Sequence, residues 1–271
     1  MDTTTFAATA DFPHTALVGV TNATETLAVQ GDANAVLPLA SVTKPLTAWG
    51  VFVAIEQGLV DLDDEAGPRG ATVQHLLDHT SGLPFEGDAA QHEPGARRTY
   101  SNAGFDALGA HVAKAVGMDF AQWMAQEVTV PLGMTSTEVT GRPSADARAS
   151  IADLLAFGRE VLKPTLITAQ LRDYALTVSQ PGLRGIVPGY GSFADNQWGL
   201  GFEVKGAKTP HWTGDTLAPE TAGHFGAKGS FFFVDLSRGL AAAFLSGIPF
   251  SDDHKRIWPA LTDEILARYG S

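Results

Sequence analysis

Short apolar runs with a β-like pattern occur toward both ends of the chain, and helical periodicity fills the middle. The predicted strands cover residues 15–20, 25–30, 198–205, 229–235 and 240–246. Turn residues separate the first two runs at 21–23 and the last two at 236–239. We therefore expect two antiparallel hairpins, one near each end of the chain.

Helical periodicity follows the first hairpin. One amphipathic helix is expected to begin near Ser41, to carry Trp49 on its apolar run and to end at Gly58, because glycine commonly follows a helix C-terminus. Ser150 and Asp153 have the spacing of a capping box at the start of another helix. The other predicted helices cover residues 73–78, 103–116, 120–128, 150–162 and 252–269, the last despite Pro259.

The order of these elements predicts an α+β fold. Strands from both ends of the chain would form one antiparallel sheet flanked by the terminal helices. Residues 1–60 and 185–271 together would make an α/β lobe, and residues 61–184 a mostly helical lobe. The seam between the two lobes is the expected position of the active-site cleft.

Composition and charge exclude several classes of protein and of site. The chain has 271 residues, 44% of them hydrophobic and 18% charged, which excludes a disordered chain, a coiled coil and a fibrous repeat. Its net charge of −12, with no basic stripe, argues against nucleic acid and anionic membranes as partners. The absence of cysteine excludes disulfides, thiol catalysis and cysteine-based metal sites. Residues 1–6 lack the basic start and apolar core of a secretion signal, which favours a cytoplasmic location.

Ser41 and Lys44 form the first candidate catalytic pair. On a helix, residues three apart project from the same face. A serine hydroxyl becomes a nucleophile when a base removes its proton, and a lysine can be that base if burial keeps part of it neutral. An S-x-x-K string alone is a weak signal, and a polar helix start is its ordinary explanation. This is the only S-x-x-K in the chain, and it opens an apolar helix in which the amine could be desolvated.

Two further segments carry chemistry or bring the backbone close to a substrate. Tyr100 and Asn102 follow a loop and precede a helix, so a phenol and a carboxamide could reach into a cleft, although an ordinary helix N-cap explains the same pattern. Residues 223–229 precede a strand, and their glycines would let the backbone approach a substrate, with a plain strand entry as the alternative. His75 and His79 have an i, i+4 spacing but lack the glutamate of a zinc-binding H-E-x-x-H, so no metal is expected.

In this order, the three segments resemble the serine β-lactamase and penicillin-binding-protein superfamily. The chain is similar in particular to the branch related to class C β-lactamases, which includes esterases and D-amino-acid peptidases. The matching text is LASVTKPLTA, GLVDLDDEAG, ATVQHLLDHTSGLP, YSNAGFDALGAHVAKAVGM, VPLGMTST, WGLGFEV and GHFGAKGSFFFVDLSRGLAAAFLS, which together span most of residues 38–246.

The resemblance implies a role for each matching position. Ser41 would be the acylated nucleophile, and Lys44 and Tyr100 would share the transfer of its proton. Asn102 would orient Lys44 and the substrate. The backbone N–H groups of Ser41 and Ala227 would form an oxyanion hole, which explains why residue 227 can be alanine. No cofactor is implied.

His224, Phe225 and Gly226 stand where many relatives have K-T-G. A lysine and a threonine can bind the carboxylate of β-lactams and of D-Ala-D-Ala peptides, whereas phenylalanine donates no hydrogen bond and histidine is mostly neutral at pH 7. We therefore expect a weakened anion site. Phe225, with some of Trp198 and Trp212, would favour an uncharged or apolar acyl group, although a core role for either tryptophan is an equal alternative.

These observations predict a serine hydrolase that acts through an acyl-enzyme on small esters, or on amides or lactones. The first alternative is a β-lactamase or a D-Ala-D-Ala peptidase, and the missing secretion signal counts against it. The second is a non-catalytic binding protein descended from the same fold. A small-molecule substrate is the only partner expected, and the oligomeric state is not indicated by the sequence.

Overall fold

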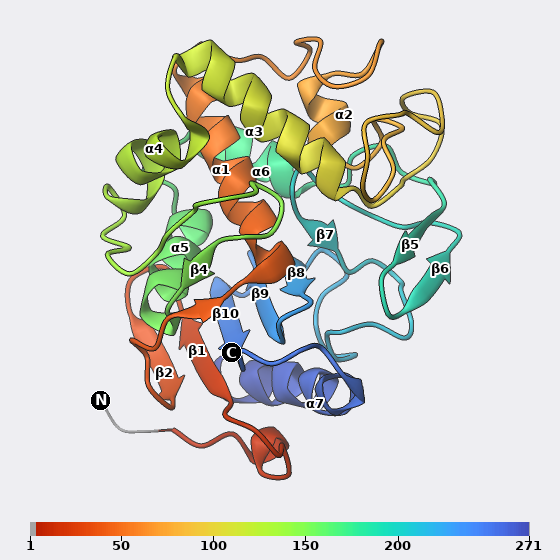
Figure 1. Ribbon diagram of the computed structural model, residues 1–271. Helices are drawn as coiled ribbons and strands as arrows, with labels where there is room; N and C mark the ends of the chain where they lie inside the picture. Colours follow the sequence, from red (N-terminus) through yellow and green to blue (C-terminus); the bar gives the residue numbers. More distant parts are fainter. Residues whose placement is uncertain (1–3, 271) are drawn as a thin grey trace.

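The computed structural model describes residues 4–270, which are built around a six-stranded sheet (Figure 1). The strand order is β2-β1-β10-β9-β8-β7, and all neighbours are antiparallel. The strands are β1 (Leu17–Thr21), β2 (Thr26–Gln30), β7 (Glu203–Val204), β8 (Ala222–Gly226), β9 (Ser230–Asp235) and β10 (Leu240–Leu245). Because β1 pairs directly with β10, the two ends of the chain share one sheet, and the predicted fold class is confirmed.

Helices cover both faces of this sheet. The C-terminal helix α7 (Asp252–Tyr269) places Trp258 against Phe231 and Phe244 on one face. Helix α5 (Ile151–Leu162) packs on the other face, against β1, β9 and β10. This second flanking helix comes from the middle of the chain, and not from a terminus as expected. The lobe boundaries at residues 60 and 185 stay a prediction.

Helix α1 (Thr43–Glu56) runs through the centre of the molecule, next to α3 (Asn102–Val116) (Figure 1). Every residue from 43 to 54 is buried, so the prediction of an amphipathic helix is wrong. The polar residues at its start are satisfied internally. Thr47 donates to the carbonyl of Pro143 at 2.6 Å. The helix is therefore fixed on all sides, which gives the residues at its N-terminus a rigid support.

The remaining elements agree in part with the sequence pattern. Those not yet named are η1 (Ala7–Thr9), β3 (Leu37–Pro38), η2 (Ala40–Val42), α2 (Val73–Leu77), α4 (Phe120–Met124), η3 (Ala125–Thr129), β4 (Arg148–Ala149), α6 (Ala169–Leu176), β5 (Gly185–Val187) and β6 (Gly191–Phe193). The predicted strand at 198–205 shrinks to β7, and the predicted helix at 120–128 changes to π-helical geometry after Met124. Helix α6 and the β5–β6 hairpin were not predicted. None of the helices described is long and apolar enough to cross a membrane.

Candidate active site

Ser41 lies in the 3-10 turn η2, immediately before α1 and not on it. The preceding Ala40 has a left-handed φ of 46°, a conformation that is strained for a residue with a Cβ atom. Strand β9 supports this turn, because the Oγ atom of Ser230 donates to the carbonyl of Leu39 at 2.7 Å. The half-buried Ser41 is thus held between the central helix and the sheet.

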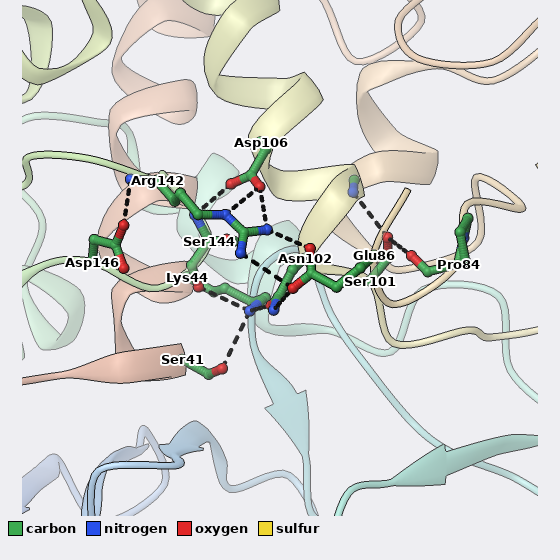
Figure 2. Close-up of polar contacts among 11 residues, drawn as sticks. Ser41, Lys44, Pro84, Glu86, Ser101, Asn102, Asp106, Arg142, Ser144 and Asp146 are labelled. Carbon is green, nitrogen blue, oxygen red and sulfur yellow. Dashed lines mark hydrogen bonds and ion pairs between the residues drawn. The ribbon is translucent and has the colours of Figure 1, made fainter. Parts of the chain in front are cut away.

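Lys44 is fully buried on the first turn of α1, and its Nζ atom has three acceptors (Figure 2). These are the Oγ atom of Ser41 at 3.3 Å, the Oδ1 atom of Asn102 at 2.7 Å and the backbone carbonyl of Ser144 at 2.9 Å. Burial lowers the pKa of the Lys44 amine to about 7. A substantial neutral fraction therefore exists near neutral pH, as a lysine that acts as a base requires.

Tyr100 brings a phenol to the same point. Its ring centroid lies 4.7 Å from the Lys44 Nζ atom, and its hydroxyl lies 3.4 Å from the Nε2 atom of His224. Burial raises the pKa of the Tyr100 hydroxyl, and the neighbouring Ser41 side chain opposes that change only in part. Tyr100 is therefore a neutral phenol at neutral pH, able to accept one proton while it donates another.

Ser101 and Asn102 form the start of helix α3, where the cap of the helix also sets the position of the Asn102 side chain. Ser101 is the N-cap of α3, and its Oγ atom accepts from the backbone N–H of Gly104 at 2.9 Å. Asn102 is the first residue of the helix, and its Oδ1 atom faces Lys44. The N-cap explanation of this segment is thus correct for Ser101, and it leaves the carboxamide of Asn102 directed at the lysine.

His224 lies on β8 and is buried. Its Nδ1 atom is 2.6 Å from the carbonyl of Phe225, so Nδ1 carries the hydrogen and Nε2 presents a lone pair toward Tyr100. Burial, with the nearby Lys44 amine as a second cause, lowers the pKa of His224 to about 3. The residue at this position of the site is consequently uncharged at neutral pH.

Phe225 and the two tryptophans are buried. Because residues 222–226 are a strand, Phe225 points to the face of the sheet opposite His224. Its ring joins the core under α7, 6.2 Å from that of Trp212. Phe225, Trp198 and Trp212 are 8%, 2% and 1% exposed, respectively. This corrects the expectation that Phe225 and a tryptophan favour an apolar acyl group. Trp212 takes the alternative role in the core, whereas the buried Trp198 packs against the rings of Tyr100 and His224, with centroids 5.8 Å and 5.3 Å away.

Gly226 ends β8 where that strand meets η2. A Cβ atom at this position would overlap the carbonyl of Leu39 and lie 3.1 Å from the backbone nitrogen of Ser41. The absence of a side chain at Gly226 thus leaves room for the turn that carries Ser41. The sequence had suggested that this glycine lets the backbone approach a substrate. The exposed Ala227 follows directly, which brings its backbone into the neighbourhood of Ser41.

Three charged residues near the site carried no signal in the sequence. The Nδ2 atom of Asn102 donates to the Oε1 atom of Glu86 at 2.9 Å. Arg142 contacts Glu86 and Asp106, each at 2.6 Å (Figure 2). These residues come from a loop, from α3 and from a second loop, so no local spacing could indicate that they meet.

A cavity of about 420 Å³ opens beside Tyr100. Phe85 and Ile186, which line it, are 52% and 53% exposed, and the Phe85 ring stacks on Tyr100 with centroids 6.0 Å apart. Large apolar side chains left open to solvent beside a polar site are typical of ligand pockets. Within residues 4–270, no group of three or more histidine, aspartate or glutamate side chains is placed to hold a metal ion.

Comparison with known proteins identifies the family of this chain. The family model described as Beta-lactamase matches residues 7–266. A structure described as a beta-lactamase from Mycobacterium bovis is 44% identical and superposes with a TM-score of 0.93, with 96% of each chain covered. Simvastatin synthase from Aspergillus terreus shares the fold, with a TM-score of 0.77 and 18% identity over 94% of this chain and 90% of that one.

Curated relatives match over shorter segments. Penicillin-binding protein 4* from Bacillus subtilis is 30% identical over 142 residues, which cover 40% of this chain and 32% of the relative. The D-alanyl-D-alanine-carboxypeptidase/endopeptidase AmpH from Escherichia coli K12 is 30% identical over 162 residues, 46% of this chain and 42% of the relative. The matches thus span less than half of either relative. The family model nevertheless covers nearly the whole chain, and the chain therefore belongs to the beta-lactamase family.

Proposed function

We propose that this protein is a serine hydrolase that cleaves small uncharged esters through an acyl-enzyme on Ser41. The observation that carries the proposal is the buried amine of Lys44, which lies 3.3 Å from the Ser41 Oγ atom and has a pKa lowered by burial to about 7. An amine that is partly neutral at neutral pH can take the serine proton as Oγ attacks the substrate carbonyl.

Each proton in this reaction has a place to go. The Ser41 proton moves to Lys44 as the Oγ–carbon bond forms, and the resulting oxyanion lies toward the N–H groups of Ser41 and Ala227. Collapse of the tetrahedral intermediate breaks the bond to the alcohol oxygen, which receives the proton from Lys44 through Tyr100. Water then attacks the acyl-enzyme with the same groups in reverse order, which releases the acid and restores Ser41.

Tyr100 acts here as a relay and not as a phenolate base. Burial raises the pKa of its hydroxyl, which makes the phenolate costly at neutral pH. The Nε2 lone pair of His224 lies 3.4 Å from this hydroxyl and can accept its hydrogen. The phenol oxygen is then free to accept the proton that Lys44 carries, and the hydrogen of the phenol turns from His224 to the leaving alcohol. His224 therefore orients a proton carrier and does not bind an anion.

The uncharged state of His224 favours the proposal that the substrates are uncharged. A pKa lowered to about 3 leaves no cation where K-T-G relatives have lysine. A second candidate activity, hydrolysis of D-alanyl-D-alanine peptides, is supported by the similarity to AmpH. Transfer of an acyl group is also supported, by 29% identity over 168 residues to monacolin J acid methylbutanoyltransferase. The peptide alternative differs from the ester proposal in the charge of the substrate, and the transfer alternative differs in the molecule that receives the acyl group. A substrate panel therefore separates them.

On such a panel, short-chain p-nitrophenyl esters should be hydrolysed with kcat/KM about two orders of magnitude above that for a chromogenic cephalosporin. The difference corresponds to about 3 kcal/mol of transition-state binding that an uncharged His224 does not supply to the cephalosporin carboxylate. His224→Lys should narrow the gap, because it restores a cation. The matched control is His111→Lys, which adds the same charge on α3 beside Asp64. A wild-type preference for the cephalosporin, or for a D-Ala-D-Ala peptide, would replace the ester proposal.

The cavity beside Tyr100 should select the length of the apolar part of the ester. Phe85→Ala and Ile186→Ala should each reduce kcat/KM for hexyl relative to ethyl esters by roughly tenfold, because they remove apolar surface that longer chains would cover. Two ester series, one with the acyl chain varied and one with the alcohol varied, show which part enters the cavity. Leu236→Ala, an exposed leucine in the turn after β9, is the control. Unchanged length dependence in both series would exclude the cavity as a subsite.

A further inference from the structure

The direction of the Lys44 amine depends on groups outside its own helix. Its two shorter hydrogen bonds go to the Oδ1 atom of Asn102 at 2.7 Å and to the carbonyl of Ser144 at 2.9 Å, and its longest goes to Ser41 at 3.3 Å. The protonated Lys44 side chain has three hydrogens in a tetrahedral arrangement, and the neutral amine has a lone pair in place of one of them. If outside acceptors fix two hydrogens, the third position, which holds the lone pair when the amine is neutral, points at Ser41.

The first acceptor is held by a carboxylate. The Nδ2 atom of Asn102 donates to the Oε1 atom of Glu86 at 2.9 Å, so the amide cannot rotate its oxygen away from Lys44 without losing this bond. The Glu86 carboxylate in turn accepts hydrogen bonds from both terminal nitrogens of Arg142, at 3.2 Å and 2.6 Å. This forked contact fixes the carboxylate in one orientation.

The second acceptor is held by the same arginine. The backbone N–H of Ser144 donates to one oxygen of Asp106 at 3.2 Å. The other oxygen of Asp106 accepts from the Nε and Nη2 atoms of Arg142, at 2.9 Å and 2.6 Å. Figure 2 shows the guanidinium of Arg142 between the two carboxylates, with Lys44 between this network and Ser41.

We propose that Arg142 is a positioning residue for the reaction, which holds Asn102 and Ser144 through Glu86 and Asp106 so that the Lys44 amine is aimed at Ser41. The proposal rests on the function given above, in which Lys44 takes the Ser41 proton. Arg142 itself contacts neither Ser41 nor Lys44 through any hydrogen bond found among residues 4–270.

The same network places opposing charges around the amine. Burial is the main cause of the lowered Lys44 pKa, Asp106 and Glu86 act to raise it, and Arg142 acts to lower it. Loss of the arginine charge therefore leaves two carboxylates uncompensated and raises the Lys44 pKa. Loss of the Glu86 charge has the opposite effect. Both side chains are nearly half exposed, so solvent reduces the size of each effect.

The other titratable groups that face Lys44 are uncharged near neutral pH. Burial, with the Lys44 amine as a further cause, lowers the pKa of His79 and of His224 well below the neutral range. Burial raises the pKa of the Tyr100 hydroxyl well above it. A change in the pH profile between pH 6 and 9 thus reports on the lysine and the three charged residues around it.

The test is the pH profile of kcat/KM for a p-nitrophenyl ester in the full-length protein. Activity should rise with pH as Lys44 loses its proton. In Arg142→Met this rising part of the profile, here called the limb, should move to higher pH by roughly one unit, and kcat at pH 7 should be about tenfold lower. In Glu86→Gln it should move to lower pH. Arg142→Lys should keep the limb near its wild-type position with a reduced kcat, because an ammonium keeps the charge without the fork.

The matched control is Arg256→Met on α7, where a guanidinium of similar exposure pairs with Asp253 at 3.3 Å, and this variant should keep the wild-type profile. A limb that stays in place in both Arg142→Met and Glu86→Gln, or that moves equally in Arg256→Met, would overturn the proposal. Labelling of Ser41 by a phosphonate is measured in parallel on the wild-type protein. Failure of that labelling rejects the hydrolase function itself, whereas labelling with an unmoved limb rejects only the role of Arg142.

Discussion

Replacement of Ser41 by alanine should reduce ester turnover by about 10⁴-fold or more and abolish the covalent adduct formed with a slow ester or a phosphonate. The reason is that the Ser41 hydroxyl is hydrogen-bonded to the Lys44 amine at 3.3 Å, and the ring of Tyr100, the second proton carrier, lies 4.7 Å from the same amine. When a nucleophile of this kind is removed, only background catalysis from binding and oxyanion stabilisation is left. Intact mass spectrometry, followed by mapping of the labelled peptide, makes the measurement.

A matched serine variant separates loss of the nucleophile from general damage. Ser237 is exposed in the turn after β9 and hydrogen-bonds Asp235 at 2.6 Å. Ser237→Ala should therefore label and turn over like the wild-type protein. An adduct that persists in Ser41→Ala at wild-type stoichiometry would place the nucleophile elsewhere and refute the proposed mechanism.

Loss of either proton carrier should cost at least about a hundredfold in kcat. Lys44→Met replaces the buried amine by an apolar chain of similar length, and Tyr100→Phe removes only the hydroxyl. Because the two groups move one proton in sequence, the double variant should be little worse than the more damaging single variant. Steady-state kinetics on one ester measures all three.

The pH dependence has a defined sign. With a Lys44 pKa near 7, wild-type kcat/KM rises as the pH increases through 7 and the amine loses its proton. Lys44→Met should lose this limb, while Tyr100→Phe keeps it at lower activity. His224→Ala should be milder than either, because His224 only orients the phenol. If His224→Ala proved the most damaging of the three, the lysine would not be the base.

Local spacing picked out the candidate parts of the site that lie within single segments, and the family resemblance gave them their roles. Ser41 and Lys44 are three residues apart, and Tyr100 and Asn102 flank an N-cap, so each pair needs only its own turn to be placed. The expectation for Phe225 is wrong because the sequence pattern predicts a strand only from residue 229, after the glycines of residues 223–229. Recognised as strand β8, the same residues put His224 and Phe225 on opposite faces.

Arg142 shows the opposite case. Its partners Glu86 and Asp106 are distant in the sequence, and the segment around it has no periodicity. Their meeting depends on how α3 and two loops pack around α1, which no local pattern records. The same limit applied to α1, because hydrophobic periodicity identifies a buried face only where another face stays polar. A helix covered on all sides has no such contrast, and Trp49 and its neighbours gave the wrong impression of one apolar stripe.

The pairing of β1 with β10 governs the order in which this protein can fold during synthesis. Leu17 lies opposite Leu245, so the strand made first has to wait for one made near the end before that edge is covered. Contacts between such distant segments slow folding, because a long loop must close before the contact energy is gained. The Ser41 turn depends on a late segment too, through the bond from Ser230 to Leu39. During translation, the nascent chain therefore carries its serine long before the scaffold that orients it exists, and the apolar strand β1 lacks its β10 partner in that interval.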